Sequence, residues 1–312
     1  MKEESIERVA VIGAGLMGLG IGVEFARFGY QVNLYNTKEA TSKNTMKGAR
    51  EDLDLMVETQ LLTTEEAKAT YNRLRPTTDL EDAASGADYV IESAPERLPL
   101  KQEIFARLDE ICPPPAILAT NTSGLRVTDI AARAKHPERI LATHYFQPPH
   151  FIPLVEVAGG EKTDRAVVEV VARVLRALRK KVVVIDIELP GFIGNRMQGV
   201  ILQEARALVD KGVCTPRIID DVIMFGFGRR MAYTGCFKRL DLVGLDGSLE
   251  RQIARGQEPW QPILERVQRG ELGMKSGKGF YDWPGDAAKR FHRKQNMELI
   301  RLIKKDMEEG SI

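Results

Sequence analysis

The sequence predicts an α/β fold, with a doubly wound sheet in the N-terminal part followed by a smaller all-helical domain. Short runs rich in Val, Ile, Leu and Ala alternate with helical patterns through the first half of the chain. Most of these runs lack polar–apolar alternation, which is typical of strands covered on both faces. Strand–helix–strand repetition of this kind indicates a parallel sheet with helices on both sides. From Gly191 onward the chain shows almost only helical patterns.

The predicted elements follow one another in an order that suggests two domains. We place strands at Val9–Ile12, Gln31–Tyr35, Tyr89–Ser93, Ala116–Thr120, Ile140–Thr143 and Lys181–Ile185. Helical patterns separate most of them, at Met17–Phe28, Lys38–Thr59, Pro99–Ile111 and Arg165–Arg179. Later helices are predicted at Phe192–Lys211, Arg217–Phe225, Pro259–Arg269 and Ala287–Met307, with Thr215 as an N-cap before Pro216. The change of character near Pro190 predicts domains 1–189 and 190–312.

Composition and charge argue against several classes of protein. The 312 residues are 43% hydrophobic and 29% charged, which is ordinary for a folded globular chain. A net charge of +1 gives no reason to expect nucleic acid or an anionic membrane as a partner. No apolar run is long enough to span a bilayer, and the N-terminus MKEESIERVAVIG lacks the pattern of a signal peptide. The widely spaced Cys112, Cys214 and Cys236 predict neither disulfides nor a metal site. We therefore expect a cytoplasmic protein without a bound metal.

The first predicted strand runs into G-A-G-L-M-G, whose glycines are Gly13, Gly15 and Gly18. After a strand and at the start of a helix, this pattern indicates Rossmann-type dinucleotide binding. Gly13 permits a tight turn, Gly15 lets the backbone approach a pyrophosphate, and Gly18 lets helix and strand pack closely. We expect Leu16 and Met17, at the helix start, to contact the cofactor as well.

The end of the second predicted strand bears on the choice of cofactor. NAD enzymes usually carry Asp or Glu about 20 residues after the glycines, where the carboxylate binds the ribose 2′-hydroxyl. This chain has Asn36, which can still bond that hydroxyl but does not repel a 2′-phosphate. Lys38 either attracts such a phosphate or is a solvated helix start. NAD is the favoured cofactor, and NADP stays open.

Further motifs follow in order along the chain. They are Asn121-Thr122-Ser123, His144 in T-H-Y-F-Q-P-P, Glu156 in L-V-E-V, G-F-I-G-N-R at 191–196 and M-K-S-G-K-G-F-Y at 274–281. Together they resemble the 3-hydroxyacyl-CoA dehydrogenase family, whose pattern has N-T-S, H-F-F-N-P, L-V-E-V, G-F-x-x-N-R and K-x-G-x-G-F-Y. The resemblance runs from Val9 to about Trp283, and five ordered motifs are more specific than any one of them.

His144 and Glu156 are the candidate acid–base pair. Oxidation of a secondary alcohol removes a hydride from carbon and a proton from oxygen, and histidine, with an unperturbed pKa of about 6.5, is suited to take that proton. A carboxylate on the second ring nitrogen would fix the tautomer and stabilise the imidazolium. A hairpin-like turn at Gln147–Pro149 would bring the two residues side by side. The alternative is that His144 is a structural core histidine; His150 contacts either substrate or solvent.

The resemblance assigns further roles residue by residue. Ser123 would hydrogen-bond the substrate oxygen and Asn195 would help to orient it; the alternatives are a turn residue and a helix-start residue. Glu96, Lys101 and Lys275 match family positions that contact the cofactor, with plain surface charge as the alternative for each.

The chain also departs from the family pattern. Gln147 stands where the family usually has Asn, and Cys236 stands where Pro is common. In acyl-CoA members the extension after the second strand tends to carry lysines, whereas the stretch Met56–Thr63 has none. Lys43 and Lys47, earlier in the same predicted helix, either replace them or are solvated.

Two arginines leave the substrate open. Some members of the superfamily oxidise small free hydroxy compounds, including gulonate, carnitine and a pyridine carboxylic acid alcohol. Arg229 and Arg230 lie in a predicted loop between helices, and guanidinium groups bind carboxylates in a bidentate manner. Either one of them clamps a free acid or both are surface arginines.

The first interpretation is an NAD(P)-dependent enzyme of fatty-acid metabolism that oxidises the alcohol carbon of a 3-hydroxyacyl-CoA. The alternative is the same chemistry on a small free hydroxy acid or alcohol. A third interpretation, a non-catalytic dinucleotide-binding relative, is disfavoured by the complete set Ser123, His144, Glu156 and Asn195. The resemblance also implies a homodimer formed through the helical domain.

Overall fold

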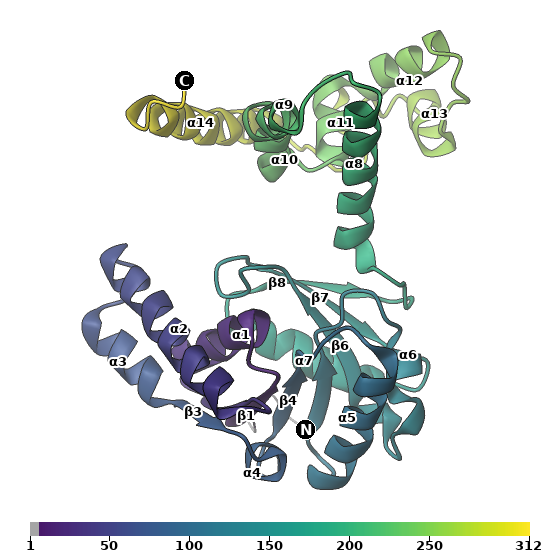
Figure 1. Ribbon diagram of the computed structural model, residues 1–312. Coiled ribbons are helices and arrows are strands. Elements are labelled where there is room, and N and C mark those ends of the chain that lie inside the picture. Colours follow the sequence, from purple (N-terminus) through teal and green to yellow (C-terminus); the bar gives the residue numbers. More distant parts are fainter. Residues whose placement is uncertain (1–5) are drawn as a thin grey trace. The chain divides into compact units, whose positions relative to one another are not determined.

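The structure is a computed structural model that describes residues 6–312. Residues 1–5 lie outside the described residues. They belong to the N-terminal segment in which the sequence predicts no signal peptide. The chain divides into two compact units, residues 1–200 and 201–312 (Figure 1). Helix α8 (Phe192–Asp210) begins in the first unit and ends in the second. No helix in the described part of the chain is both long and apolar enough to cross a bilayer.

The described residues of the first unit form an eight-stranded sheet in the order β3-β2-β1-β4-β5-β6-β7-β8. The strands are β1 (Arg8–Ile12), β2 (Gln31–Tyr35), β3 (Leu74–Thr77), β4 (Tyr89–Glu92), β5 (Ile117–Thr120), β6 (Ile140–Tyr145), β7 (Leu154–Gly159) and β8 (Lys181–Ile185). The predicted α/β class with a doubly wound sheet is confirmed. Edge strand β3 was not predicted, because the sequence L-R-P-T is short and contains a proline, which is tolerated at a sheet edge.

The sheet is not parallel throughout, which corrects the prediction for its last strand. Neighbouring strands from β3 to β6 are parallel, whereas β7 is antiparallel to β6 and parallel to β8. The connection between β6 and β7 is short and contains no helix, and a parallel crossover needs a dozen or more residues. Strands β7 and β8 therefore run opposite to the other six.

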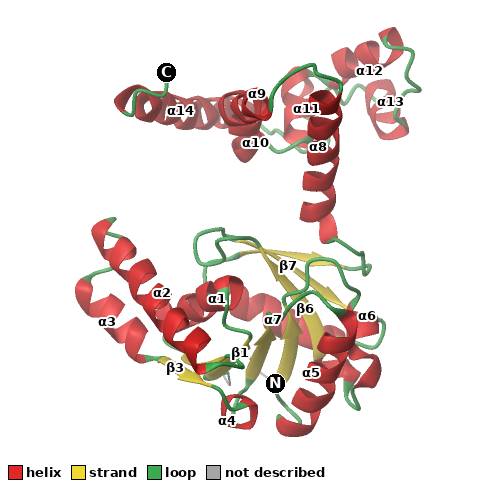
Figure 2. Cartoon of the chain, viewed as in Figure 1, coloured by secondary structure: helices red, strands yellow, loops and turns green. Residues whose placement is uncertain are grey.

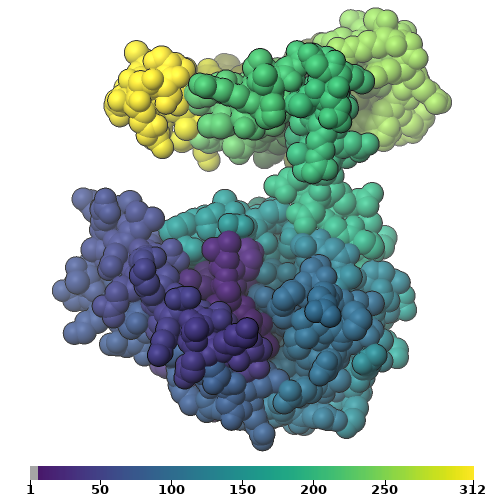
Figure 3. Space-filling model, viewed as in Figure 1, coloured from purple at the N-terminus to yellow at the C-terminus, as the bar shows by residue number. Residues whose placement is uncertain are grey.

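Helices cover both faces of this sheet (Figure 2). They are α1 (Leu16–Arg27), α2 (Glu39–Glu58), α3 (Thr64–Asn72), α4 (Leu80–Ala84), α5 (Leu98–Ile111), α6 (Val127–Ile130) and α7 (Arg165–Ala177). Successive residues of β1 point to opposite faces: Val9 and Val11 join the core beneath α1, α2, α3 and α7, and Ala10 and Ile12 join the core beneath α4, α5 and α6. In the space-filling view, purple α1 is flanked by the blue atoms of α2 and α3 (Figure 3).

The order of the strands positions the site. The chain continues from β1 to β2 on one side and later places β4 on the other, so the direction of winding reverses at β1. In open α/β sheets, such a reversal leaves a crevice at the carboxyl ends of the strands. The loops after β1 and β4 therefore define where a ligand can enter.

The second unit contains only helices and loops among its described residues. Its helices after α8 are α9 (Pro216–Asp221), α10 (Gly228–Thr234), α11 (Phe237–Val243), α12 (Leu245–Ala254), α13 (Gln261–Gln268) and α14 (Ala287–Glu308). The predicted N-cap is confirmed, since the Thr215 hydroxyl accepts the N–H of Ile218. A π-helical turn, Val222–Phe227, follows α9.

The K-S-G-K-G-F-Y motif has a structural role in this unit. The buried carboxylate of Asp241, on α11, accepts the N–H groups of Phe280 and Tyr281 and the indole N–H of Trp283. A Cβ atom on Gly279 would lie 2.3 Å from Oδ1 of Asp241, so only glycine fits at that position. The motif is thus fastened to α11 by a single carboxylate.

Candidate active site

The glycine turn after β1 is built as its sequence predicts. Gly13 has a φ of +94°, and a Cβ atom there would lie 2.9 Å from the carbonyl group of Ser93. A Cβ atom on Gly18 would lie 2.3 Å from the carbonyl oxygen of Gly13, so helix α1 can approach the strand only because this residue is glycine. Gly15 differs, because no atom lies within 4 Å of its Cβ direction. The backbone at Gly15 is therefore open to a ligand.

A cavity of about 610 Å³ lies against this turn. Its lining includes the expected cofactor residues Gly13, Gly15, Leu16, Met17 and Asn36, together with Tyr35, Thr37 and the loop after β4. Helix α1 has no side-chain cap at its start, so its first N–H groups are available to an anion. The cavity therefore adjoins free N–H groups of the kind that would meet the pyrophosphate of a dinucleotide.

The Asn36 side chain is buried and has a defined orientation. Its Nδ2 atom donates to Oγ1 of Thr45, at 3.1 Å. That hydroxyl lies 2.6 Å from the carbonyl oxygen of Ala14 and 3.0 Å from that of Thr41. Because the Thr45 proton is directed to a carbonyl oxygen, its oxygen accepts from Asn36, and Oδ1 of Asn36 keeps its capacity to accept a hydrogen bond.

His144 and Glu156 are in contact, as the hairpin-like turn predicts. They are register partners on β6 and β7, and Nδ1 of His144 lies 2.8 Å from Oε2 of Glu156. The other carboxylate oxygen accepts the N–H groups of Ile193 and Gly194, each at 3.0 Å, in the first turn of α8. Both side chains are at most 5% exposed. Glu156 therefore fixes the imidazole and the start of α8 at once.

Aromatic rings hold the imidazole from two sides. The Phe192 ring stacks on it and the Phe146 ring is tilted against it, each with its centroid 4.7 Å away. Nε2, the ring nitrogen that does not contact Glu156, lies 3.4 Å from Nδ2 of Asn195. His144 lines a second cavity, so this nitrogen is the one that can meet a substrate.

This second cavity has a volume of about 580 Å³ and brings together three of the four predicted catalytic residues. Ser123, His144 and Asn195 line it, and Glu156 lies behind His144. Both cavities are lined by Met17 together with Ser93 and Ala94 after β4, so they adjoin. A ligand in the first cavity can therefore reach a ligand in the second.

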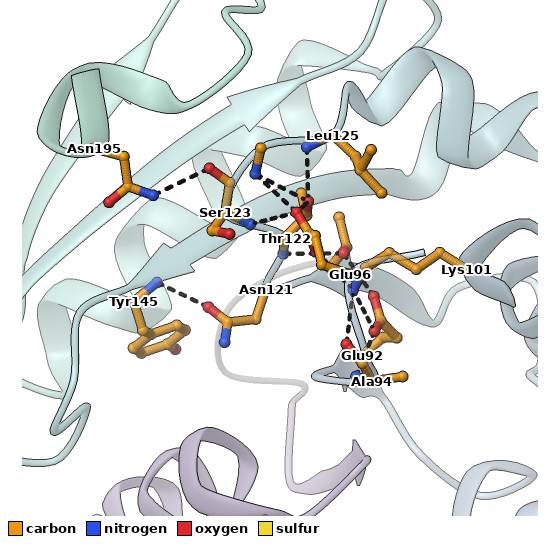
Figure 4. Close-up of polar contacts among 12 residues, drawn as sticks. Glu92, Ala94, Glu96, Lys101, Asn121, Thr122, Ser123, Leu125, Tyr145 and Asn195 are labelled. Carbon is orange, nitrogen blue, oxygen red and sulfur yellow. Dashed lines mark hydrogen bonds and ion pairs between the residues drawn. The ribbon is translucent and has the colours of Figure 1, made fainter. Parts of the chain in front are cut away.

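The loop that carries Ser123 is held by Glu96, one of the predicted cofactor residues (Figure 4). The Glu96 carboxylate accepts the Thr122 hydroxyl at 2.5 Å and the N–H groups of Ser123 and Gly124 at 3.0 and 2.9 Å. Burial alone would raise the pKa of Glu96, but these donors and the Lys101 ammonium outweigh it and lower the pKa. Nδ2 of Asn195 donates to the carbonyl oxygen of Ser123, at 3.1 Å, so α8 is tied to the same loop.

Lys101 is buried, so the alternative interpretation of this residue as a surface charge is wrong. Its side chain is 1% exposed, and Nζ lies 2.7 Å from Oε1 of the fully buried Glu92. Glu92 also accepts the N–H of Ala94 and the Thr120 hydroxyl, each at 2.6 Å. This carboxylate, at the end of β4, therefore ties the loop after β4 to the last residue of β5. Glu92 is not among the residues predicted from the sequence, although it is the one charged residue in its strand, Y-V-I-E.

The remaining predicted residues belong to the second unit. Lys275 forms an ion pair with Asp246. The Arg229 guanidinium is paired with Asp306 and lies 5.0 Å from the centroid of the Phe225 ring. Both arginines lie in helix α10 and not in a loop, which corrects that prediction. Arg230 is exposed and forms no ion pair with any of residues 6–312. Of the two arginines, Arg229 is already bonded to a carboxylate of the chain. Among residues 6–312, no group of three or more His, Cys, Asp or Glu side chains is placed so that it could hold a metal ion.

Comparison with known proteins agrees with this geometry. The family model described as "3-hydroxyacyl-CoA dehydrogenase, NAD binding domain" matches residues 8–188, and "3-hydroxyacyl-CoA dehydrogenase, C-terminal domain" matches residues 191–283. The chain is 32% identical to 5-formyl-3-hydroxy-2-methylpyridine 4-carboxylate 5-dehydrogenase of Mesorhizobium japonicum, over 95% of this chain and 97% of the relative. It is 34% identical to a probable 3-hydroxybutyryl-CoA dehydrogenase of Bacillus subtilis, over 89% and 98%.

A solved structure gives the same assignment. The crystal structure of a 3-hydroxyacyl-CoA dehydrogenase from Archaeoglobus fulgidus has a TM-score of 0.78 and 30% identity, covering 96% of this chain and 99% of that one. The resemblance that the ordered motifs indicate is therefore confirmed. This chain belongs to the 3-hydroxyacyl-CoA dehydrogenase family, whose members are NAD-dependent dehydrogenases that act on CH–OH groups.

Proposed function

We propose that this chain oxidises the alcohol carbon of a 3-hydroxyacyl-CoA, with His144 and Glu156 as the acid–base pair and NAD as the cofactor. The observation that carries the proposal is the 2.8 Å contact that orients His144, which lines a cavity next to the one against the glycine turn. When bound in the cavity against the glycine turn, a nicotinamide cofactor would supply the acceptor for the hydride. Family membership supports the reaction type, and the 3-hydroxyacyl-CoA relatives support this substrate.

The chain's own residues supply the proton chemistry. Nε2 of His144 takes the proton of the substrate hydroxyl, while the Glu156 carboxylate at Nδ1 stabilises the imidazolium that results. Ser123 and Asn195 line the same cavity and hold the substrate oxygen near Nε2. Two aromatic rings keep the imidazole in one plane and exclude water from its faces.

The orientation of Asn36 supports NAD over NADP. Thr45 engages the amide nitrogen, and Oδ1 stays an acceptor. A ribose 2′-hydroxyl can donate to that oxygen, whereas a 2′-phosphate dianion has no proton to offer and meets a like partial charge. Lys38, exposed at the start of α2, is the group that would counter this preference.

A small free hydroxy acid is the second candidate substrate. The Mesorhizobium relative, matched along nearly the whole chain, is named for a pyridine carboxylate. Met56–Thr63 carries no lysine that could meet the phosphates of CoA, and Arg230 is an exposed guanidinium that no acid among the described residues neutralises.

Reduction of the nicotinamide, followed by absorbance, tests the proposal. NAD and NADP are offered separately, first with 3-hydroxybutyryl-CoA and then with free hydroxy acids. Turnover of the thioester with NAD, abolished in His144→Ala, is the expected result. Turnover of free hydroxy acids alone would favour a free acid over a 3-hydroxyacyl-CoA as the substrate. In that case Arg230→Ala should weaken turnover and Lys47→Ala should leave it unchanged. Absence of turnover on every substrate with both cofactors would refute the proposal.

We also infer a homodimer. Helix α8 buries only Phe192, while Met197, Val200, Ile201 and Leu202 are between 37% and 66% exposed. Apolar side chains gathered on one helix mark an interaction surface, and the family resemblance points to a second copy. Sedimentation analysis should give twice the mass of the chain, and Val200→Glu with Leu202→Glu should shift it toward one copy.

A further inference from the structure

A buried lysine outside the acid–base pair holds one wall of the candidate active site. The Lys180 side chain, between α7 and β8, is 3% exposed. Its Nζ atom lies 2.7 Å from the carbonyl oxygen of Pro149, 3.2 Å from that of Ile152 and 3.1 Å from Oε1 of Glu24. An ammonium has three N–H groups, so these three acceptors use its full donor capacity.

The loop that Lys180 binds is the connection between β6 and β7. Phe146, Gln147 and Ile152 of this loop line the same cavity as His144. The N–H groups of Phe151 and Ile152 both donate to the carbonyl oxygen of Pro148, which makes a tight turn. Lys180 therefore binds the outer side of a turn whose inner side lines the candidate substrate cavity.

Glu24 anchors the lysine to helix α1, which starts at the glycine turn. The second carboxylate oxygen of Glu24 accepts from Arg27 at 2.9 Å. Gly20, one turn earlier, leaves room for the loop, since a Cβ atom there would lie 2.7 Å from the Pro149 ring. Removing two charges from water is costly, so a buried ion pair such as this one is stable only where its geometry and further hydrogen bonds offset that cost.

We propose that Lys180 is a positioning residue that, with Glu24, fixes the loop Gln147–Ile152 against helix α1 and so sets the substrate wall of the cavity. The inference deepens the proposed function and rests on it, because the loop matters for catalysis only if the cavity holds the substrate. It requires no contact between Lys180 and the substrate. The expected signature is impaired substrate use with intact cofactor binding.

The test compares Lys180→Met with Arg139→Met as a matched control. Arg139 is also a buried cation that binds backbone carbonyls, in the turn after α5, and it pairs with Asp109. It lines neither of the two cavities. Both variants should lose thermal stability. Only Lys180→Met should speed hydrogen exchange at the amides of Phe151 and Ile152 and lower kcat/KM for the hydroxy substrate by about tenfold or more, with the Kd of NADH unchanged.

Each outcome has a definite meaning. Equal exchange at these amides in the two variants, or an unaltered kcat/KM in Lys180→Met, would overturn the positioning role. If Lys180→Met does not fold, Lys180→Met combined with Glu24→Gln removes the uncompensated carboxylate and is measured in its place. If the wild type oxidises no hydroxy substrate, the proposed function is wrong, while the exchange comparison still decides whether Lys180 holds the loop.

Discussion

His144 and Glu156 are cross-strand partners in the antiparallel pair β6–β7, with Nδ1 of one 2.8 Å from Oε2 of the other. The two residues are 12 positions apart in the chain, and the register of a single hairpin brings them together. Residues directly opposite in an antiparallel pair have Cβ atoms about 4.5–5.5 Å apart. The imidazole is thus oriented by sheet pairing, on rigid strands.

We expect Glu156→Gln to lower kcat while the fold is kept. The amide oxygen can still accept the N–H groups of Ile193 and Gly194, but it no longer stabilises an imidazolium. General acid–base catalysis contributes about 10²–10⁴-fold, so His144→Ala should lose a factor in this range and Glu156→Gln a smaller one. Steady-state kinetics measure kcat for each variant, and titration with NADH shows whether the cofactor site is intact. A Glu156→Gln enzyme with full kcat would show that the carboxylate has no part in proton transfer.

We expect Thr45→Val to weaken NAD binding indirectly, through the orientation of Asn36. The hydroxyl that accepts from Nδ2 of Asn36 is removed, so the amide is free to turn. Loss of one oriented hydrogen bond of about 1.4 kcal/mol raises a dissociation constant about tenfold. Fluorescence titration with NADH measures it, and the relative affinity for NADPH should rise. Thr70→Val, a buried threonine that lines neither cavity, is the control.

Asp109→Asn should reduce the acid sensitivity of the fold. Burial alone raises the pKa of Asp109, but the Arg139 guanidinium and the N–H groups of Lys135 and His136 outweigh it and lower the pKa. A carboxyl group whose pKa is lower in the folded state stabilises the protein above its unfolded pKa of about 3.9. That contribution is lost as the pH falls through the folded pKa.

The free energy of unfolding, measured in urea between pH 7 and pH 3, tests this sign. The wild type should lose more stability than Asp109→Asn across that interval. At pH 7 the variant should be less stable by about 3 kcal/mol, since Arg139 is left with an uncompensated buried charge. A variant whose stability falls with pH as steeply as that of the wild type would contradict the assignment.

The cysteines should differ in reactivity. Burial raises the pKa of the Cys112 thiol to about 11, so almost no thiolate forms there at pH 8. Cys236 is exposed. Iodoacetamide at pH 8, followed by peptide mass spectrometry, should modify Cys236 in the native protein and Cys112 only after unfolding. Modification of Cys112 at the rate of Cys236 would show that the core around α5 opens readily.

Local patterns predict much of this protein because they reflect local physics. Val9–Ile12 followed by G-A-G-L-M-G predicts a strand, a turn and a helix start, since apolar burial and the steric freedom of Gly13 act within a few residues. The same holds for the helix after Thr215-Pro216. The ordered motifs also single out Ser123, His144, Glu156 and Asn195 as candidates, and their roles stay predictions.

By itself, then, the sequence determined the fold class, most of the elements, the family and the candidate residues. Only the tertiary structure decided which charges are buried. No local pattern shows that Lys101 and Lys180 are buried, yet the ammonium group of each is surrounded by acceptors that lie on other segments of the chain. Tertiary structure also decided that β8 pairs parallel with β7, and so runs opposite to strands β1–β6, and that Thr45 orients Asn36. The reason is physical: desolvation and hydrogen-bond satisfaction depend on which distant segments meet, and no local pattern records that.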